Sequence, residues 1–148
     1  MYQKVLVPLD RSKFAECSLD HVIKLSQMGD IGEVILVNVL DPIFWCREGC
    51  DFVAFRNVVF RQADRYLEKI RSRLASKGIK AKSEILEGGM PASCIIKYTR
   101  DNAIDLIIIT SYGNTGIKNM MLGSVALAVL HDSHVPVLLI RPEVGGVE

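Results

Sequence analysis

Five short apolar runs alternate with amphipathic segments along this chain, and this alternation restricts the fold more than any other feature. The runs are rich in β-branched residues and have the length of strands. They cover Lys4–Leu9, Glu33–Leu40, Lys80–Glu87, Asp105–Thr110 and Val135–Ile140. Helical spacing of apolar residues predicts four helices between them, at about Ser12–Met28, Asp51–Lys77, Pro91–Asp101 and Ser124–His131. A chain with this order of elements forms a parallel sheet with right-handed crossovers.

The pattern inside the runs separates central strands from an edge strand. Three runs are almost continuously apolar, which is typical of central parallel strands that helices cover on both faces. The run from Lys80 to Glu87 alternates instead, with Ala81, Ser83 and Ile85 opposite charged side chains. This alternation predicts an edge. We therefore expect an α/β fold, a doubly wound open five-stranded parallel sheet with helices on both faces, in a single domain over residues 1–148.

Composition fits one domain and limits its partners. The 148 residues are 49% hydrophobic, and 18 basic against 17 acidic side chains leave a net charge of +1. A chain of this length buries ~70% of its unfolded surface without help from disulfides or metals. The lack of a basic excess argues against nucleic acid as a partner. The uncharged stretch Asn119–Leu130 is too short to cross a bilayer and the first residues lack a signal-peptide pattern, so we expect a cytoplasmic protein without membrane association.

The four cysteines, Cys17, Cys46, Cys50 and Cys94, are expected to be reduced thiols in that compartment. A zinc site at Cys46 and Cys50 would need two more ligands at suitable spacing, and a redox pair usually has two intervening residues rather than three. Both alternatives are therefore disfavoured. The surrounding segment, Asp41–Phe55, is unusually aromatic. Its rings would cover a ligand, dock on a second subunit, or pack beneath the following helix.

The most informative segment runs from Thr110 to Leu130. It leaves the end of an apolar strand, where ligands bind in doubly wound sheets, and passes through glycines and a lysine to a helix start at Gly123 and Ser124. Glycines let backbone N–H groups approach an anion, and a helix start supplies unpaired donors. The segment lacks the Gly-Lys-Ser/Thr ending of a P-loop, and no Gly-x-Gly-x-x-Gly follows the first strand. The alternative is a glycine-rich turn with an ordinary serine cap.

Several segments together resemble the universal stress protein family. Gly113, nine intervening residues and then Gly123-Ser124 match the second half of that family's motif Gly-x2-Gly-x9-Gly-Ser/Thr, whose backbone binds the phosphates of ATP. The opening VLVPLDRS, the strand end VNVLD, and the segments EGGMPASCII and VPVLLIRP are similar to other parts of the family. The resemblance covers essentially the whole chain. It implies a Rossmann-like sheet of the adenine nucleotide alpha hydrolase-like type, with strand order 3-2-1-4-5.

The resemblance also implies a site for ATP, ADP or AMP, with Mg²⁺ as an optional companion ion. Asp10 stands where the family's acid contacts the adenosine portion, and the backbone at Val39 would meet the adenine. The implied ligand contacts are Pro8, Leu9, Asp10, Val39, Thr110, Gly113, Gly123, Ser124, Val125 and Ala126. Without the resemblance, an acid at the position of Asp10 is often an N-cap or a loop residue. The last strand, Val137–Ile140, would pair with its copy across the two-fold axis of a homodimer.

Two positions depart from the family pattern. Thr110 replaces the first motif glycine and adds a Cβ close to the ribose or the phosphates. Ala126 stands where many ATP-binding members carry a hydroxyl group, and this removes a phosphate contact. Both departures are expected to weaken binding, whereas Gly123 and Ser124 are expected to preserve the anion-binding end of the site.

The leading interpretation is a cytoplasmic homodimeric module that binds a nucleotide and serves signalling or stress adaptation. Asp132, Ser133 and His134 are consecutive, so their side chains diverge and do not form a catalytic triad. Slow ATP hydrolysis, with Lys118 neutralising charge, is the most activity we expect. Two alternatives stay open: an enzyme that uses ATP to adenylate or phosphorylate a small substrate, and a dimerisation module that binds no nucleotide.

Overall fold

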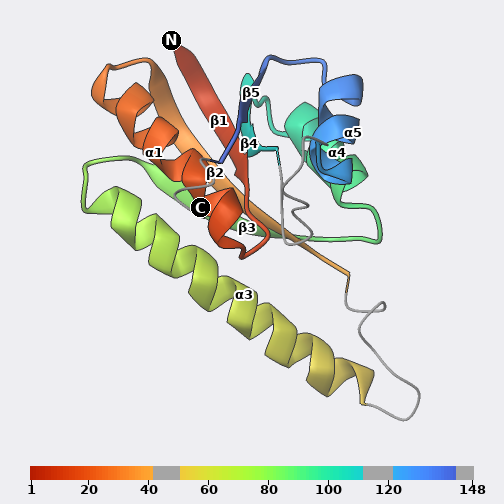
Figure 1. Ribbon diagram of the computed structural model, residues 1–148. Helices are drawn as coiled ribbons and strands as arrows, with labels where there is room; N and C mark the ends of the chain where they lie inside the picture. The colour runs from red at the N-terminus through yellow and green to blue at the C-terminus, as the bar shows by residue number, and fades with distance from the viewer. Residues whose placement is uncertain (42–50, 112–121, 143–148) are drawn as a thin grey trace, which may run out of the picture.

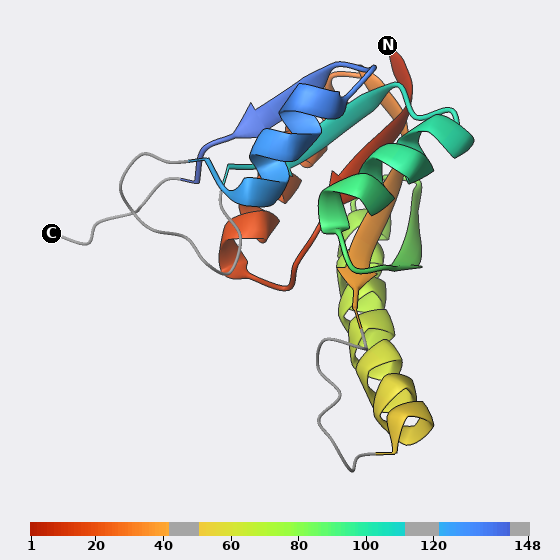
Figure 2. The same ribbon diagram turned by 90° about the vertical axis from the view of Figure 1, so that its right-hand side faces the viewer.

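The computed structural model describes residues 1–41, 51–111 and 122–142. Its five strands form one parallel sheet in the order β3-β2-β1-β4-β5 (Figures 1 and 2). The strands are β1 (Tyr2–Pro8), β2 (Ile31–Leu40), β3 (Ala81–Glu87), β4 (Leu106–Thr110) and β5 (Val137–Ile140). The described helices are α1 (Lys13–Gln27), α3 (Phe52–Ala75), α4 (Pro91–Asp101) and α5 (Ser124–Asp132). The predicted fold class, the strand order and the edge position of the third strand are confirmed.

Strand boundaries differ from the expected ones where backbone pairing extends or shortens the ladder. Both β1 and β2 begin two residues early, because Tyr2 already pairs with Ile31. Strand β4 begins one residue late, at Leu106. Asp105 just before it binds β1 through both its backbone and its side chain: its N–H donates to the Lys4 carbonyl (3.0 Å), and its carboxylate accepts hydrogen bonds from the N–H groups of Gln3 (2.7 Å) and Lys4 (2.9 Å). Strand β5 begins two residues late, directly after a proline, which has no N–H to donate to the ladder.

Side chains on the two faces of the sheet enter two separate cores, because successive residues of a strand point to opposite faces. Val5 and Val7 of β1 belong to the core under α1 and α3, and Leu6 between them belongs to the core under α4 and α5. Figures 1 and 2 show these helix pairs on opposite faces of the sheet. The two cores account for the continuously apolar sequence of the central strands.

The helix ends follow signals that are visible in the sequence. The side chain of Ser12 accepts a hydrogen bond from the N–H of Ala15 (3.0 Å) and caps α1, as predicted. Asp51 caps α3 through the N–H of Val53 (3.1 Å), with a second bond from the next residue. Gly78 lies just beyond the end of α3 with a φ of +77°, a left-handed conformation that glycine adopts without steric cost.

Only the C-terminal part of α3 packs against the sheet. Its fully or nearly fully buried residues are Ala63, Leu67, Ile70 and Leu74. The N-terminal turns project past the edge of the sheet (Figures 1 and 2), and Val53 and Val58 are 65% and 47% exposed there. Arg56 connects this end of the helix to β3, since its Nε and Nη2 donate to the two carboxylate oxygens of Glu87 at 2.9 and 2.8 Å.

Most of the aromatic segment Asp41–Phe55 lies outside the described residues, which include only its two ends. Phe52 and Phe55 belong to the first turn of α3, where Phe52 is exposed and Phe55 is half-buried. The expectations for Phe44, Trp45, Cys46 and Cys50 therefore remain predictions. Cys17 and Cys94 are each partly buried, and the Cys17 Sγ lies 3.6 Å from the carbonyl oxygen of Lys13.

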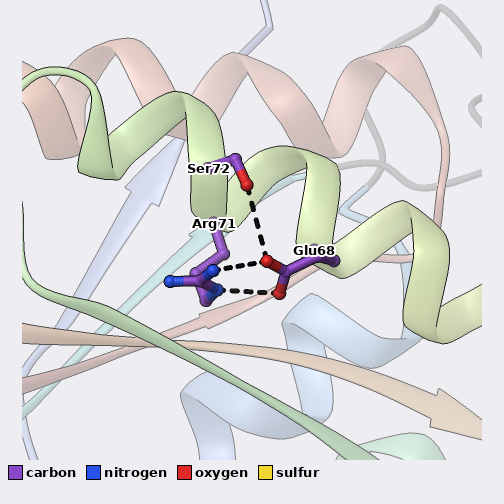
Figure 3. Close-up of polar contacts among 3 residues, drawn as sticks. All are labelled: Glu68, Arg71 and Ser72. Atoms are coloured by element: carbon purple, nitrogen blue, oxygen red, sulfur yellow. Dashed lines mark hydrogen bonds and ion pairs between the residues drawn. The ribbon is translucent and has the colours of Figure 1, made fainter.

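The solvent-facing side of α3 carries the polar contacts drawn in Figure 3. The Arg71 guanidinium donates from Nε to Oε2 of Glu68 at 2.8 Å and from Nη2 to Oε1, and the Ser72 hydroxyl lies 3.5 Å from Oε1. Because all three side chains are exposed to solvent that screens their charges, we expect this cluster to contribute little to stability.

A buried carboxylate on β2 is paired with lysines at the start of β3. The side chain of Glu33 is only 9% exposed, and its Oε1 lies 3.0 Å from Nζ of Lys82 and 3.6 Å from Nζ of Lys80. The hydrogen bond from Lys82 lowers the pKa of Glu33 below its ordinary value; burial opposes this effect, and the charge of Lys80 reinforces it.

This pairing predicts a stability effect that depends on pH. A carboxyl group with a lowered pKa in the folded state stabilises the fold above its unfolded value of 4.5, and this contribution is lost as the pH falls through the folded-state pKa. Lys82→Met should therefore lower the free energy of unfolding by about 0.5–1 kcal/mol at pH 7. The difference from the unmodified chain should shrink as the pH falls below 4.5, which urea unfolding at pH 7, 5 and 3 would measure.

Lys97→Met is the matched control for this prediction. Lys97 also pairs with a carboxylate, Asp101, at 3.2 Å, but both side chains are exposed, at 81% and 54%. We expect a smaller loss of stability from this variant. If the effect of Lys82→Met were as large at pH 3 as at pH 7, the Glu33 charge would not be its cause.

Candidate functional site

A pocket of about 310 Å³ opens at the carboxyl edge of the sheet. It lies at the point where the winding reverses, between the neighbouring strands β1 and β4. Nine of the ten residues that the resemblance implies as ligand contacts line it: Pro8, Leu9, Asp10, Val39, Thr110, Gly123, Ser124, Val125 and Ala126. The tenth, Gly113, lies outside the described residues. The chain thus brings together three strand ends and the start of α5.

Seven further residues line the pocket and were not named from the sequence: Ala15, Val37, Asn38, Pro91, Ile95, Ile109 and Ser111. Five are apolar or a proline, so much of the pocket lining is apolar. Asn38, Ile109 and Ser111 are chain neighbours of predicted contacts, and this position next to Val39 or Thr110 was a usable signal. Ala15 and Ile95 come from helices, and only tertiary packing brings them here.

The end of β1 turns sharply into α1 at the rim of the pocket. Asp10 follows the strand, and its Oδ1 accepts a hydrogen bond from the N–H of Ser12 at 2.9 Å. Arg11 between them has a φ of +69°, which non-glycine residues rarely adopt. The helix cap is Ser12 rather than Asp10. Asp10 therefore holds the turn with one oxygen while it lines the pocket.

A tyrosine from α3 lies behind this turn. Burial raises the pKa of Tyr66, and the nearby carboxylates of Glu16 and Asp10 raise it further. The phenol is therefore neutral over the physiological range. Tyr66 therefore adds no negative charge beside Asp10 at this end of the pocket.

The start of α5 forms the polar end of the pocket. Gly123 is the N-cap, its N–H donates to the Ser111 carbonyl at 2.6 Å, and its own carbonyl accepts from Leu127 N–H at 2.9 Å. Ser124 is the first helical residue, so the alternative of an ordinary serine cap is wrong. The N–H groups of Ser124 and the next two residues precede the first intrahelical bond and have no acceptor within the helix. They form a positively polarised rim suited to an anion.

Two buried polar atoms near the pocket have no hydrogen-bond partner in the described part of the chain. They are the Oδ1 of Asn38 and the Oγ of Ser111, on residues that are 4% and 1% exposed. Unpaired polar atoms are uncommon in protein interiors and often mark functional positions. Both residues line the pocket, one at the end of β2 and the other just after β4.

The donors of the pocket do not fit a resident metal ion. Asp10 is the one carboxylate among its described lining residues, and residues 1–41, 51–111 and 122–142 contain no group of three or more His, Cys, Asp or Glu side chains placed to hold a metal. A Mg²⁺ ion here would depend mainly on ligand oxygens and water. None of the described helices has the length and apolar character needed to cross a membrane.

The chain is a small α/β domain with a doubly wound parallel sheet. Its pocket lies at the switch point of the sheet, next to a glycine-capped helix start, which is where domains of this class usually bind ligands. The model of the universal stress protein family matches residues 1–141 of the chain. The chain belongs to the universal stress protein family, which confirms the resemblance found in the sequence.

Individual relatives cover nearly the full chain. Universal stress protein MJ0577 of Methanocaldococcus jannaschii is 33% identical, over 95% of this chain and 96% of its own length. The solved structure of MJ0577 superposes with a TM-score of 0.83, covering 95% of this chain and 96% of the other. YxiE of Bacillus subtilis is 31% identical, over 95% of this chain and all of its own length. An Arabidopsis thaliana family protein with AMP bound is 18% identical with a TM-score of 0.69, covers 99% of this chain and 95% of its own, and shares the fold.

Proposed function

We propose that this protein is a cytoplasmic homodimeric module that binds an adenine nucleotide in the switch-point pocket and acts in signalling or stress adaptation. The observation that carries the proposal is the convergence of an apolar surface, a carboxylate and a helix start on one pocket. These three features match the base, the ribose and the phosphate of a nucleotide. At about 310 Å³, the pocket is at the lower end of the range for small-molecule sites.

Each part of the ligand would meet a different element. The base would lie against apolar side chains such as Val37, Ile95 and Ile109, whose burial supplies most of the affinity. The Asp10 carboxylate would accept a hydrogen bond from a ribose hydroxyl or the adenine amine. The phosphate would accept hydrogen bonds from the backbone N–H groups at the start of α5, which begins at Ser124.

Thr110 and Ala126 modify this site without removing it. Both line the pocket and are 5% and 3% exposed, so their side chains are packed into its wall. A threonine side chain at the end of β4 narrows the space that a glycine would leave. Donation by backbone N–H groups needs no side-chain hydroxyl at position 126. We therefore infer weakened but retained binding.

The AMP-bound Arabidopsis structure supports an adenine nucleotide as the ligand, because it shows that this fold accommodates one. The proposed dimer has separate support. Strand β5 is an edge of the sheet and leaves one row of backbone groups unpaired within the described chain. Leu138 on this strand is 36% exposed, and Leu127 and Leu130 of α5 are 56% and 37% exposed. A second copy paired along β5 would cover them.

The direct test is to identify what the protein binds. We expect mass spectrometry of small molecules released from denatured, freshly purified protein to detect an adenine nucleotide. Calorimetric titration of the emptied protein with ATP, ADP and AMP, with and without Mg²⁺, would measure affinity, and sedimentation would measure the oligomeric state. A flat titration at millimolar nucleotide with an intact dimer would favour the nucleotide-free dimerisation module. Steady multiple turnover of labelled ATP would favour an enzyme.

A further inference from the structure

Leu9, the last residue before Asp10 and the turn into α1, forms two hydrogen bonds with β2, one through its N–H and one through its carbonyl. Beyond the β1–β2 ladder, which ends at Pro8, the Leu9 N–H donates to the Val37 carbonyl at 2.7 Å. The Leu9 carbonyl accepts a hydrogen bond from the side-chain Nδ2 of Asn38, also at 2.7 Å. Leu9 and Asn38 are 2% and 4% exposed, so these bonds are shielded from water.

The orientation of the Asn38 amide follows from its partner. A backbone carbonyl can only accept, so the side-chain atom that meets Leu9 must be the NH₂ group. The oxygen of the amide is then left buried without a partner in the described residues. A buried unpaired acceptor loses its hydrogen bonds to water without replacing them, which destabilises the fold. Asn38 is flanked along β2 by buried leucines at positions 36 and 40, and an apolar side chain there would avoid this cost.

We propose that Asn38 is a positioning residue for the nucleotide site and acts through Asp10. Its bond to the Leu9 carbonyl fixes the peptide group that joins Leu9 to Asp10. The next two residues complete a tight turn, in which Arg11 adopts a left-handed conformation and Ser12 N–H binds Asp10 Oδ1. Asn38 thus fixes the peptide group before Asp10, and the Ser12 N–H fixes the Asp10 carboxylate. Together the two hydrogen bonds keep Asp10 at the wall of the pocket.

The proposal rests on the proposed function for its effect on affinity, but its structural part can be tested without any ligand. In the empty protein, Asn38→Leu should increase the hydrogen-exchange rates of the Leu9 and Ser12 amides by roughly tenfold, the factor expected for one lost hydrogen bond of about 1.4 kcal/mol. Amides in the centre of the sheet should keep their rates. Unchanged exchange at Leu9 and Ser12 in a folded variant would overturn the proposal.

The effect on binding is tested by a double-mutant cycle with AMP as the probe. Asn38→Leu should weaken AMP binding roughly tenfold in the otherwise unchanged chain, and less than about twofold when Asp10→Asn is already present. Equal weakening in both backgrounds would show that Asn38 does not act through Asp10, and no weakening would show that it does not position the site. Asn38→Ala replaces Asn38→Leu in both experiments if the leucine variant does not fold.

Thr99→Val is the matched control. The Thr99 hydroxyl donates to the Ile95 carbonyl at 2.7 Å and is fully buried, but Thr99 does not line the pocket. This variant should lower thermal stability without changing AMP affinity or exchange at Ser12. If the unmodified chain binds no adenine nucleotide, the proposed function fails, while the exchange experiment still decides whether Asn38 positions the turn.

Discussion

Replacing Gly123 with valine is expected to abolish nucleotide binding while leaving the domain folded. Gly123 caps α5 with φ and ψ of −57° and 150°, a conformation that valine adopts readily. Its side chain would project beside the N–H groups that begin the helix at Ser124 and block the approach of a phosphate. Loss of hydrogen bonds to a charged phosphate, worth about 3 kcal/mol, corresponds to roughly 100-fold weaker binding or more. Calorimetric titration with AMP and ATP would measure this loss.

The matched control for this variant removes a side chain from the same pocket. Thr110→Gly restores the residue of the family motif at the end of β4, and we expect affinity equal to or several times higher than that of the unmodified chain. Thermal unfolding of both variants would show that they remain folded. A folded Gly123→Val protein with unchanged affinity would show that the nucleotide binds elsewhere, and weaker binding by Thr110→Gly would show that Thr110 contributes a contact.

Truncating Leu67 should produce the largest loss of stability among the substitutions considered. Leu67 lies on the packed half of α3, is fully buried, and belongs to the core shared with β1 and β2. Leu67→Ala removes three carbon atoms and leaves a cavity that the neighbouring side chains fill only partly, which typically costs 2–5 kcal/mol. The free energy of unfolding from a urea titration, with the slope unchanged, would report this effect.

Val58→Ala, on the same helix, is the control for Leu67→Ala. Val58 is 47% exposed on the projecting turns, so its truncation should change the free energy of unfolding by less than about 0.5 kcal/mol. A loss comparable to that of Leu67→Ala would show that the projecting turns of α3 are packed against another surface in solution. Concentration dependence of the transition would then identify a second copy as that surface.

Most of the fold could be predicted because its determinants are local. β-Branched apolar runs specify strands, and helical spacing of apolar residues specifies the helices. Ser12 and Gly78 mark helix ends through a side-chain hydrogen bond to a nearby N–H and through a left-handed backbone conformation, both of which involve only neighbouring residues. The differences in strand boundaries arose where a proline or contacts with another strand set the end of the ladder. The Asp105 carboxylate, for example, binds the backbone of β1, a contact between residues about one hundred positions apart.

The predicted site residues came from spacing along the chain and from resemblance. Neither of these shows which elements lie next to one another in the fold. They predicted Asp10 and the Gly123 segment, which line the pocket, and they left open whether Ser124 caps its helix. They did not identify Ile95 or Asn38, whose roles depend on which elements become neighbours. Asn38 in particular lies in an apolar strand, and nothing in the sequence indicates that its amide reaches the end of a different strand.

The sequence by itself determined the class of fold, the edge position of β3 and the family, because periodicity and motif spacing are properties of the chain. Only the tertiary structure decided which residues share the pocket, that Ser124 follows the cap rather than forming it, and that Asn38 holds the carbonyl before Asp10. The physical reason is the distance along the chain over which each effect acts. Strand and helix preferences act over a few residues, whereas a pocket at a switch point exists only after β1 and β4, far apart in the chain, have paired side by side.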